Sequence, residues 1–162
     1  QPLNDISEIT HYFETIHHGE FEEKINQVAD IVSASEQIVF ICVGTSGILG
    51  KYGARYFSNI GKFSYVIDDP FYPNIGHVSE RAVAIVLSVS GETEQTINLA
   101  RHFLQQRCTI VSITNSTSST LAKMSHYNLS YYMTSQKNNK EYDITTQVPV
   151  VFILESIGRR IK

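Results

Sequence analysis

Five short apolar runs alternate along the chain with segments of helical periodicity, and this alternation restricts the possible folds more than any other feature. The runs occupy residues 38–43, 63–67, 82–87, 109–113 and 127–133. Continuous apolar runs of this length are typical of strands buried on both faces, with helices covering a parallel sheet. The sequence therefore predicts an α/β fold: a three-layer αβα sandwich around a five-stranded parallel sheet with right-handed crossovers.

The segments between these runs place apolar residues three or four positions apart, as amphipathic helices do. We expect helices over residues 21–35, 47–61, 97–104, 121–125 and 145–160. The last of these is apolar on nearly every side, so it is a candidate for a subunit interface or for burial within one subunit. Residues 135–143, SQKNNKEYD, are read as a polar loop.

Length and charge narrow the class of protein. A chain of 162 residues suits a single domain spanning 1–162. With 13 Lys and Arg against 16 Asp and Glu, its net charge of −3 makes it a poor nucleic-acid binder by itself. It has no apolar stretch long enough for a membrane span and no signal peptide, so we expect a cytoplasmic location.

No feature of the sequence calls for a metal or a cofactor. Cys42 and Cys108 lie in or beside apolar runs, and we interpret them as buried reduced thiols rather than zinc ligands or a disulfide framework. The chain begins at Gln1 rather than Met and stops on a basic helical segment. We therefore expect it to be a fragment of a longer protein.

Three of the predicted strands run into turns rich in Gly, Ser and Thr. These turns are GTSG (44–47), SVSGET (88–93) and TNSTSST (114–120), and each precedes a predicted helix. Ligands of open parallel sheets bind beyond the carboxyl ends of the strands, where these turns would meet. Helix N-termini offer unpaired N–H groups, glycine allows close approach, and short hydroxyls add donors, so the turns suit a phosphate.

Two other interpretations of the turns compete with a phosphate site. Ser, Thr and Asn also cap helices without any ligand, although Ser88, Ser90 and Thr93 offer more hydroxyls than one cap needs. Glycines at 44, 47 and 50 have the wrong spacing for the dinucleotide motif, even though Asp68 or Asp69 follows near the expected distance, and the chain has no P-loop. A phosphate site without a nucleotide is thus favoured.

VGTSG (43–47), SVSGETEQT (88–96) and SITNSTSSTLA (112–122) together resemble the sugar isomerase (SIS) domain family, and the resemblance covers about residues 20–160. It implies an αβα sandwich, a dimer and hydroxyls that bind the phosphate of a phosphosugar. The implied binding residues are Thr45, Ser46, Ser88, Ser90, Gly91 and Thr93, with Ser118 and Ser119 as weaker matches.

Two details resemble the effector domains of RpiR-type transcription regulators. They are the leading helix that runs into IVFICVGTSG (38–47) and the segment KEYDITTQVPVVFILESI (140–157). The resemblance implies a phosphosugar effector, a homodimer or tetramer, and DNA contact only through an N-terminal helix-turn-helix domain that this chain lacks.

The alternative is a sugar-phosphate isomerase, which needs a base to move a proton between two carbons. The candidate groups are Glu92, Glu94, His77, His126, Glu141, Asp143 and Glu155. None forms a recognisable catalytic pair in the sequence. Glu141 and Asp143 lie in the last loop, which in the family approaches the sugar, so Glu141 is included as a binding residue. We therefore favour a sensor over an enzyme and assign no catalytic residue.

Overall fold

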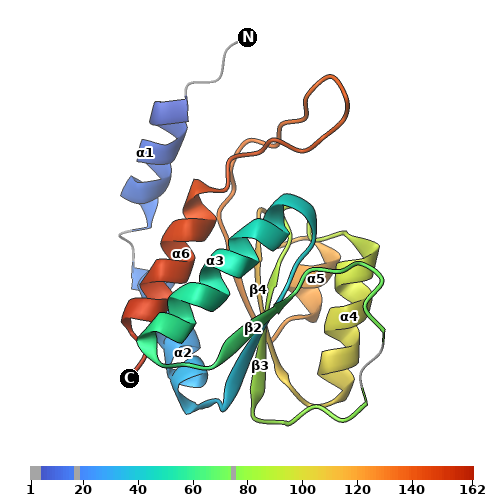
Figure 1. Cartoon of the computed structure of the whole chain (residues 1–162). Helices are drawn as coiled ribbons and strands as arrows, with labels where there is room; N and C mark the ends of the chain where they lie inside the picture. Colours follow the sequence, from blue (N-terminus) through green and yellow to red (C-terminus); the bar gives the residue numbers. More distant parts are fainter. Residues whose placement is uncertain (1–4, 17–18, 74–75) are drawn as a thin grey trace.

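The computed structural model describes residues 5–16, 19–73 and 76–162 (Figure 1). Its strands are β1 (Gln37–Ile41), β2 (Ser64–Ile67), β3 (Ala82–Leu87), β4 (Thr109–Thr114) and β5 (Tyr127–Ser130). Its helices are α1 (Asp5–Thr15), α2 (Gly19–Ala34), α3 (Gly44–Ile60), α4 (Glu94–Gln105), α5 (Thr120–Met124) and α6 (Val148–Arg159). Apart from α1, every element was expected from the sequence.

The strands form one sheet in the order β2-β1-β3-β4-β5, and all four pairings are parallel. Phe40 of β1, for example, lies between Val66 of β2 and Ile85 of β3. The predicted five-stranded parallel sheet is confirmed. Its strand order reverses between β1 and β3, because the chain proceeds from β1 outward to β2 and from β3 outward to β4.

Helices cover both faces of the sheet, so alternate residues of each central strand are buried on opposite sides. Ile38 and Phe40 pack in one core with residues of α2, α3 and α6, whereas Val39 and Ile41 pack in a second core with residues of α4. Figure 1 shows α2, α3 and α6 on one side of the sheet and α4 and α5 on the other. This is the predicted three-layer sandwich.

Several boundaries differ from the sequence expectations by a few residues, and three of these differences affect the site or the C-terminal part of the fold. α3 begins at Gly44, so GTSG forms the first helical turn instead of a turn before the helix. β5 ends at Ser130 rather than at residue 133. α6 begins at Val148, with Pro149 in its first turn, where a missing N–H costs no hydrogen bond.

The helix α1 was not predicted, because its apolar face consists of few residues. Tyr12 is buried against the core, and Phe13 packs edge-on against Phe152 of α6. The i, i+3, i+4 spacing of Ile9, Tyr12 and Phe13 is the signal that identifies this helix.

The last helix, α6, is largely buried within the chain. Val150, Ile153, Leu154 and Ile157 belong to the core shared with α2 and α3, which favours the second of the two interpretations of its apolar surface. Both cysteines are free and buried, as predicted. Within the described residues, no helix combines the length and apolar character that crossing a membrane requires.

Candidate functional site

A cavity of about 460 Å³ opens at the carboxyl ends of β1 and β3, the point where the strand order reverses. Open α/β sheets bind ligands at this position, and the volume is that of a small-molecule site. The lining comes from residues 43–46, 87–96 and 137–147. Six of the eight predicted site residues line it: Thr45, Ser46, Ser88, Ser90, Thr93 and Glu141.

The first wall of the cavity is the N-terminus of α3. Gly44 adopts a φ of 58°, which turns the chain from β1 directly into the helix. The N-cap residue is Val43, whose side chain makes no cap hydrogen bond. The Ser46 hydroxyl makes a long contact of 3.4 Å with Gln147 Oε1. This helix end therefore presents N–H groups without a side-chain cap, together with a hydroxyl, to the cavity.

The second wall is the turn between β3 and α4. Ser88 Oγ accepts a hydrogen bond from Gly91 N–H at 3.0 Å, and Ser90 Oγ accepts one from Glu92 N–H at 3.1 Å. Both oxygens act as acceptors in these bonds, so neither bond uses a hydroxyl proton, and the only further contact of the Ser88 hydroxyl among the described residues is a long one of 3.5 Å to the Thr93 hydroxyl. Thr93 is the N-cap of α4, but its side chain makes no cap hydrogen bond.

The third hydroxyl-rich turn differs from the other two because its helix is capped. Ser119 Oγ accepts from Ala122 N–H at 3.2 Å at the start of α5. Ser118 is exposed and its hydroxyl contacts Ser116 Oγ at 2.8 Å. Neither lines the cavity. Capping thus accounts for α5, whereas α3 and α4 have no side-chain cap.

Gly91 joins the second turn to the third without lining the cavity. Its φ is +67°, and a Cβ there would lie 2.1 Å from Ser119 Oγ. Its carbonyl accepts from Leu121 N–H at 3.0 Å. The absence of a side chain at Gly91 lets the two turns pack together, and this contact fixes the position of Ser88 and Ser90.

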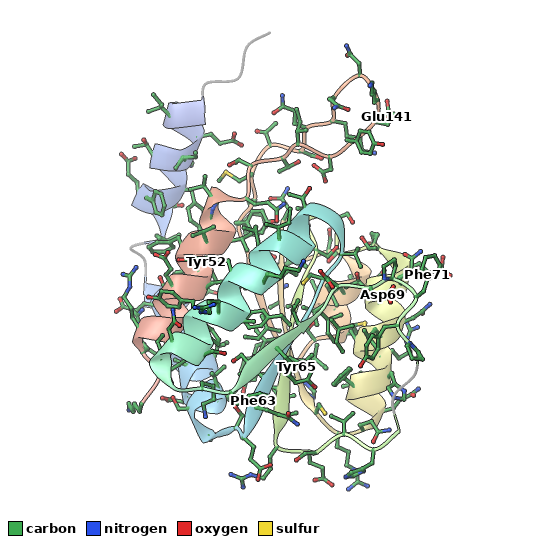
Figure 2. The ribbon with its side chains drawn as sticks, viewed as in Figure 1. Tyr52, Phe63, Tyr65, Asp69, Phe71 and Glu141 are labelled. Carbon is green, nitrogen blue, oxygen red and sulfur yellow. The ribbon has the colours of Figure 1, made fainter. Side chains whose placement is uncertain are left out.

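The third wall is a hairpin that we define as residues 134–147. It is held by an antiparallel bridge between Lys137 and Asp143, and Asn138 N–H donates to Tyr142 O at 3.0 Å. Glu141 sits near the end of this projecting hairpin with a φ of 66° (Figure 2). Lys137, Glu141 and Asp143 line the cavity, so its hairpin side is charged and its helix side is neutral.

The other candidate acids lie outside the cavity lining. Glu92 accepts from Thr120 N–H at 3.1 Å, and hydrogen bonds from the Thr120 hydroxyl and N–H lower the pKa of this carboxyl. Glu155 of α6 accepts a hydrogen bond at 2.6 Å from the hydroxyl of Tyr52, the α3 residue labelled in Figure 2, and this bond joins α3 to α6. Glu155 also accepts from Arg159 at 2.9 Å within α6. Both carboxylates therefore stabilise contacts between elements of the fold.

The candidate histidines are also remote from the cavity. His77 is exposed, and Nδ1 of His126 accepts from Ile110 N–H at 2.9 Å near the start of β4, the opposite end of the sheet. Among the residues that the structure describes, no histidine lines the cavity.

The Glu92 contact predicts a pH dependence of stability. A carboxyl whose pKa falls on folding stabilises the fold above its unfolded pKa of about 4.3, and that contribution disappears as the pH falls through the folded pKa. Glu92→Gln should therefore flatten the acid limb of a melting-temperature profile measured from about pH 3 to pH 7. Glu94→Gln, two residues later at the start of α4, is the control. Equal acid limbs in wild type and Glu92→Gln would contradict the assignment.

The lining residues that sequence reasoning did not identify include Thr96, Lys137 and Gln147. Thr96 lies three residues after Thr93 on α4, and this spacing is a signal that was available. Lys137 and Gln147 lie in the last loop, whose path across the sheet edge cannot be read from local sequence.

Residues 31–154 match the model of the SIS domain family. The chain belongs to the SIS domain family. This match confirms the resemblance inferred from the three turns. The five-stranded parallel sheet is the expected architecture, and solved structures of such domains share it.

The relatives of this domain include both enzymes and regulators. A probable arabinose 5-phosphate isomerase from Haemophilus influenzae is 28% identical over 108 residues, which are 65% of this chain and 32% of the isomerase. The chain thus spans about a third of that relative. The Escherichia coli CFT073 protein c3406, solved in complex with a phosphosugar, superposes with a TM-score of 0.79 at 21% identity, covering 96% of this chain and 85% of that one. The sugar isomerase domain of an RpiR transcription factor from Sphaerobacter thermophilus superposes with a TM-score of 0.78 at 11% identity, covering 98% of this chain and 89% of that one.

Proposed function

We propose that this domain is the phosphosugar-binding effector domain of a cytoplasmic transcription regulator of carbohydrate metabolism. The observation that carries the proposal is the convergence of two uncapped helix N-termini, those of α3 and α4, on one open cavity lined by Ser46, Ser88, Ser90 and Thr93. Unpaired N–H groups and hydroxyls bind a phosphate dianion without a cation. The charged hairpin faces them and is placed to contact the sugar hydroxyls.

Family relationships support the same proposal. An RpiR transcription factor contains a domain of this fold, and a protein of this fold has been solved with a bound phosphosugar. In our proposal the parent protein is a homodimer or a tetramer, and a separate N-terminal helix-turn-helix domain contacts DNA. Phosphosugar binding would close the turns at 88–93 and 114–120 together with the hairpin. Such closure transmits a signal only if the ligand binds two dimer states with different affinities.

A sugar-phosphate isomerase is the second candidate, because Glu141 and Asp143 line the cavity opposite the hydroxyls. A carboxylate there can serve as the base that moves a proton between C1 and C2. Against this role, Asp143 Oδ1 already accepts from Thr145 N–H at 2.9 Å, and both carboxylates are exposed to water. The sensor is therefore the proposal that we favour.

Calorimetric titration with a panel of pentose, hexose and amino-sugar phosphates tests both candidates. Each mixture is afterwards analysed for conversion between aldose and ketose phosphates. Binding without conversion supports the sensor. Conversion that disappears in Glu141→Gln or Asp143→Asn, while binding remains, would establish the isomerase instead. Failure of every phosphosugar to bind would reject both.

A further inference from the structure

Thr96 is a buried polar residue that is not among the binding residues predicted from the sequence. It is the third residue of α4, and only 2% of its surface is exposed. Its hydroxyl oxygen is closed to solvent and has no hydrogen-bond partner among the described residues. Thr96 also lines the cavity. A buried hydroxyl without a partner destabilises a protein, and valine would fill the same volume without that cost.

The position of Thr96 relates it to the proposed phosphate site. Residues three apart in a helix lie one above the other, so Thr96 lies on the same face of α4 as Thr93. Thr93 contacts Ser88 Oγ at 3.5 Å, a long contact that holds the intervening turn weakly. Thr96 therefore lies one helical turn below the residues that meet the ligand first, at an N-terminus that has no side-chain cap.

We propose that Thr96 is a further ligand-binding residue, whose hydroxyl donates a hydrogen bond to the anionic end of a phosphosugar. This inference rests on the proposed function. Because the oxygen is closed in the unliganded chain, binding must move the turn formed by residues 88–93 slightly away from Thr96. The unsatisfied hydroxyl then gains its partner only in the complex, which increases the difference in stability between the free and bound states.

Thr96→Val tests the proposal, with Thr96→Ser as the variant that restores the hydroxyl. Affinity is measured by calorimetry with arabinose 5-phosphate and with inorganic phosphate, the shared anionic part of any phosphosugar. A hydrogen bond to a charged group predicts a loss of about 10- to 100-fold for Thr96→Val and a change below about threefold for Thr96→Ser. Without ligand, Thr96→Val should melt at the wild-type temperature or above it.

Thr114→Val is the matched control. Thr114 is equally buried, but its hydroxyl donates to Ser116 O at 2.9 Å, and it does not line the cavity. Loss of this hydrogen bond should lower the melting temperature of Thr114→Val, whereas Thr96→Val should not lower it.

Two outcomes would overturn the inference. The first is an affinity of Thr96→Val within about threefold of wild type, since loss of a hydrogen bond to the phosphate should cost far more. The second is an equal loss in Thr96→Ser, which would point to packing of the methyl group. Both require that the wild-type chain bind arabinose 5-phosphate or phosphate. If it binds neither of these nor any member of the panel, the proposed function itself is wrong.

Discussion

The double variant Ser90→Ala/Thr93→Ala is expected to lose phosphosugar binding while it remains folded. Both hydroxyls line the cavity, and each is expected to donate to the phosphate. A hydrogen bond to a charged group contributes about 1.5–3 kcal/mol, so losing two should weaken binding by about 100-fold or more. Calorimetric titration of wild type and variant with the tightest ligand of the panel measures this loss.

Ser33→Ala/Ser35→Ala is the matched control for that experiment. It also removes two hydroxyls, but at the end of α2, before β1, where Ser35 Oγ donates to Val32 O and Ser33 Oγ accepts from Lys162 N–H. Its affinity should equal that of wild type. Circular dichroism of both double variants reports folding. A folded Ser90→Ala/Thr93→Ala chain with unchanged affinity would show that the phosphate binds elsewhere.

Gly91→Ala is expected to destabilise the fold by about 2–4 kcal/mol. A left-handed φ of +67° costs a residue with a side chain about 1–2 kcal/mol. The new Cβ would also lie 2.1 Å from Ser119 Oγ and 2.4 Å from Ser119 Cβ, so Ser119 must move and its cap on α5 is lost. Loss of a cap costs about 1 kcal/mol. Urea unfolding measures the free energy of unfolding.

A second substitution separates the two causes of this effect. Ser119→Gly removes the two atoms that the new Cβ would overlap, Ser119 Oγ and Cβ, but it leaves the backbone strain at residue 91. Gly91→Ala/Ser119→Gly should therefore be more stable than the sum of the two single effects predicts, by about 1 kcal/mol or more. Additive effects would contradict a direct contact between the two turns.

Much of the fold could be predicted because its signals are local. The run AVAIVL was predicted as a strand, and β3 spans the same residues, Ala82–Leu87. A helix was expected over residues 47–61, and Gly61 caps α3 in the left-handed conformation. The start of α3 was predicted less well, because the composition of GTSG (44–47) suits both a turn before a helix and the first turn of the helix itself.

The candidate site could be predicted in part. The hydroxyl residues of the first two turns were identified from their chemistry, since short polar side chains at a strand-to-helix junction suit an anion. From the sequence alone, the third turn (114–120) was expected to bind the phosphate in the same way as the first two. In the structure, Ser119 caps α5 while Thr93 caps nothing, and local composition does not distinguish these two situations.

The sequence by itself determined the alternation of buried strands and helices and the family to which the chain belongs, because hydrophobic period and turn chemistry act over a few residues. Only the tertiary structure decided that β1 and β3 are neighbours at the reversal of strand order, that the 134–147 hairpin faces their ends, and that Thr96 is buried without a partner among the described residues. These features depend on packing between residues as far apart as Ser46 and Gln147, and no local pattern encodes such contacts.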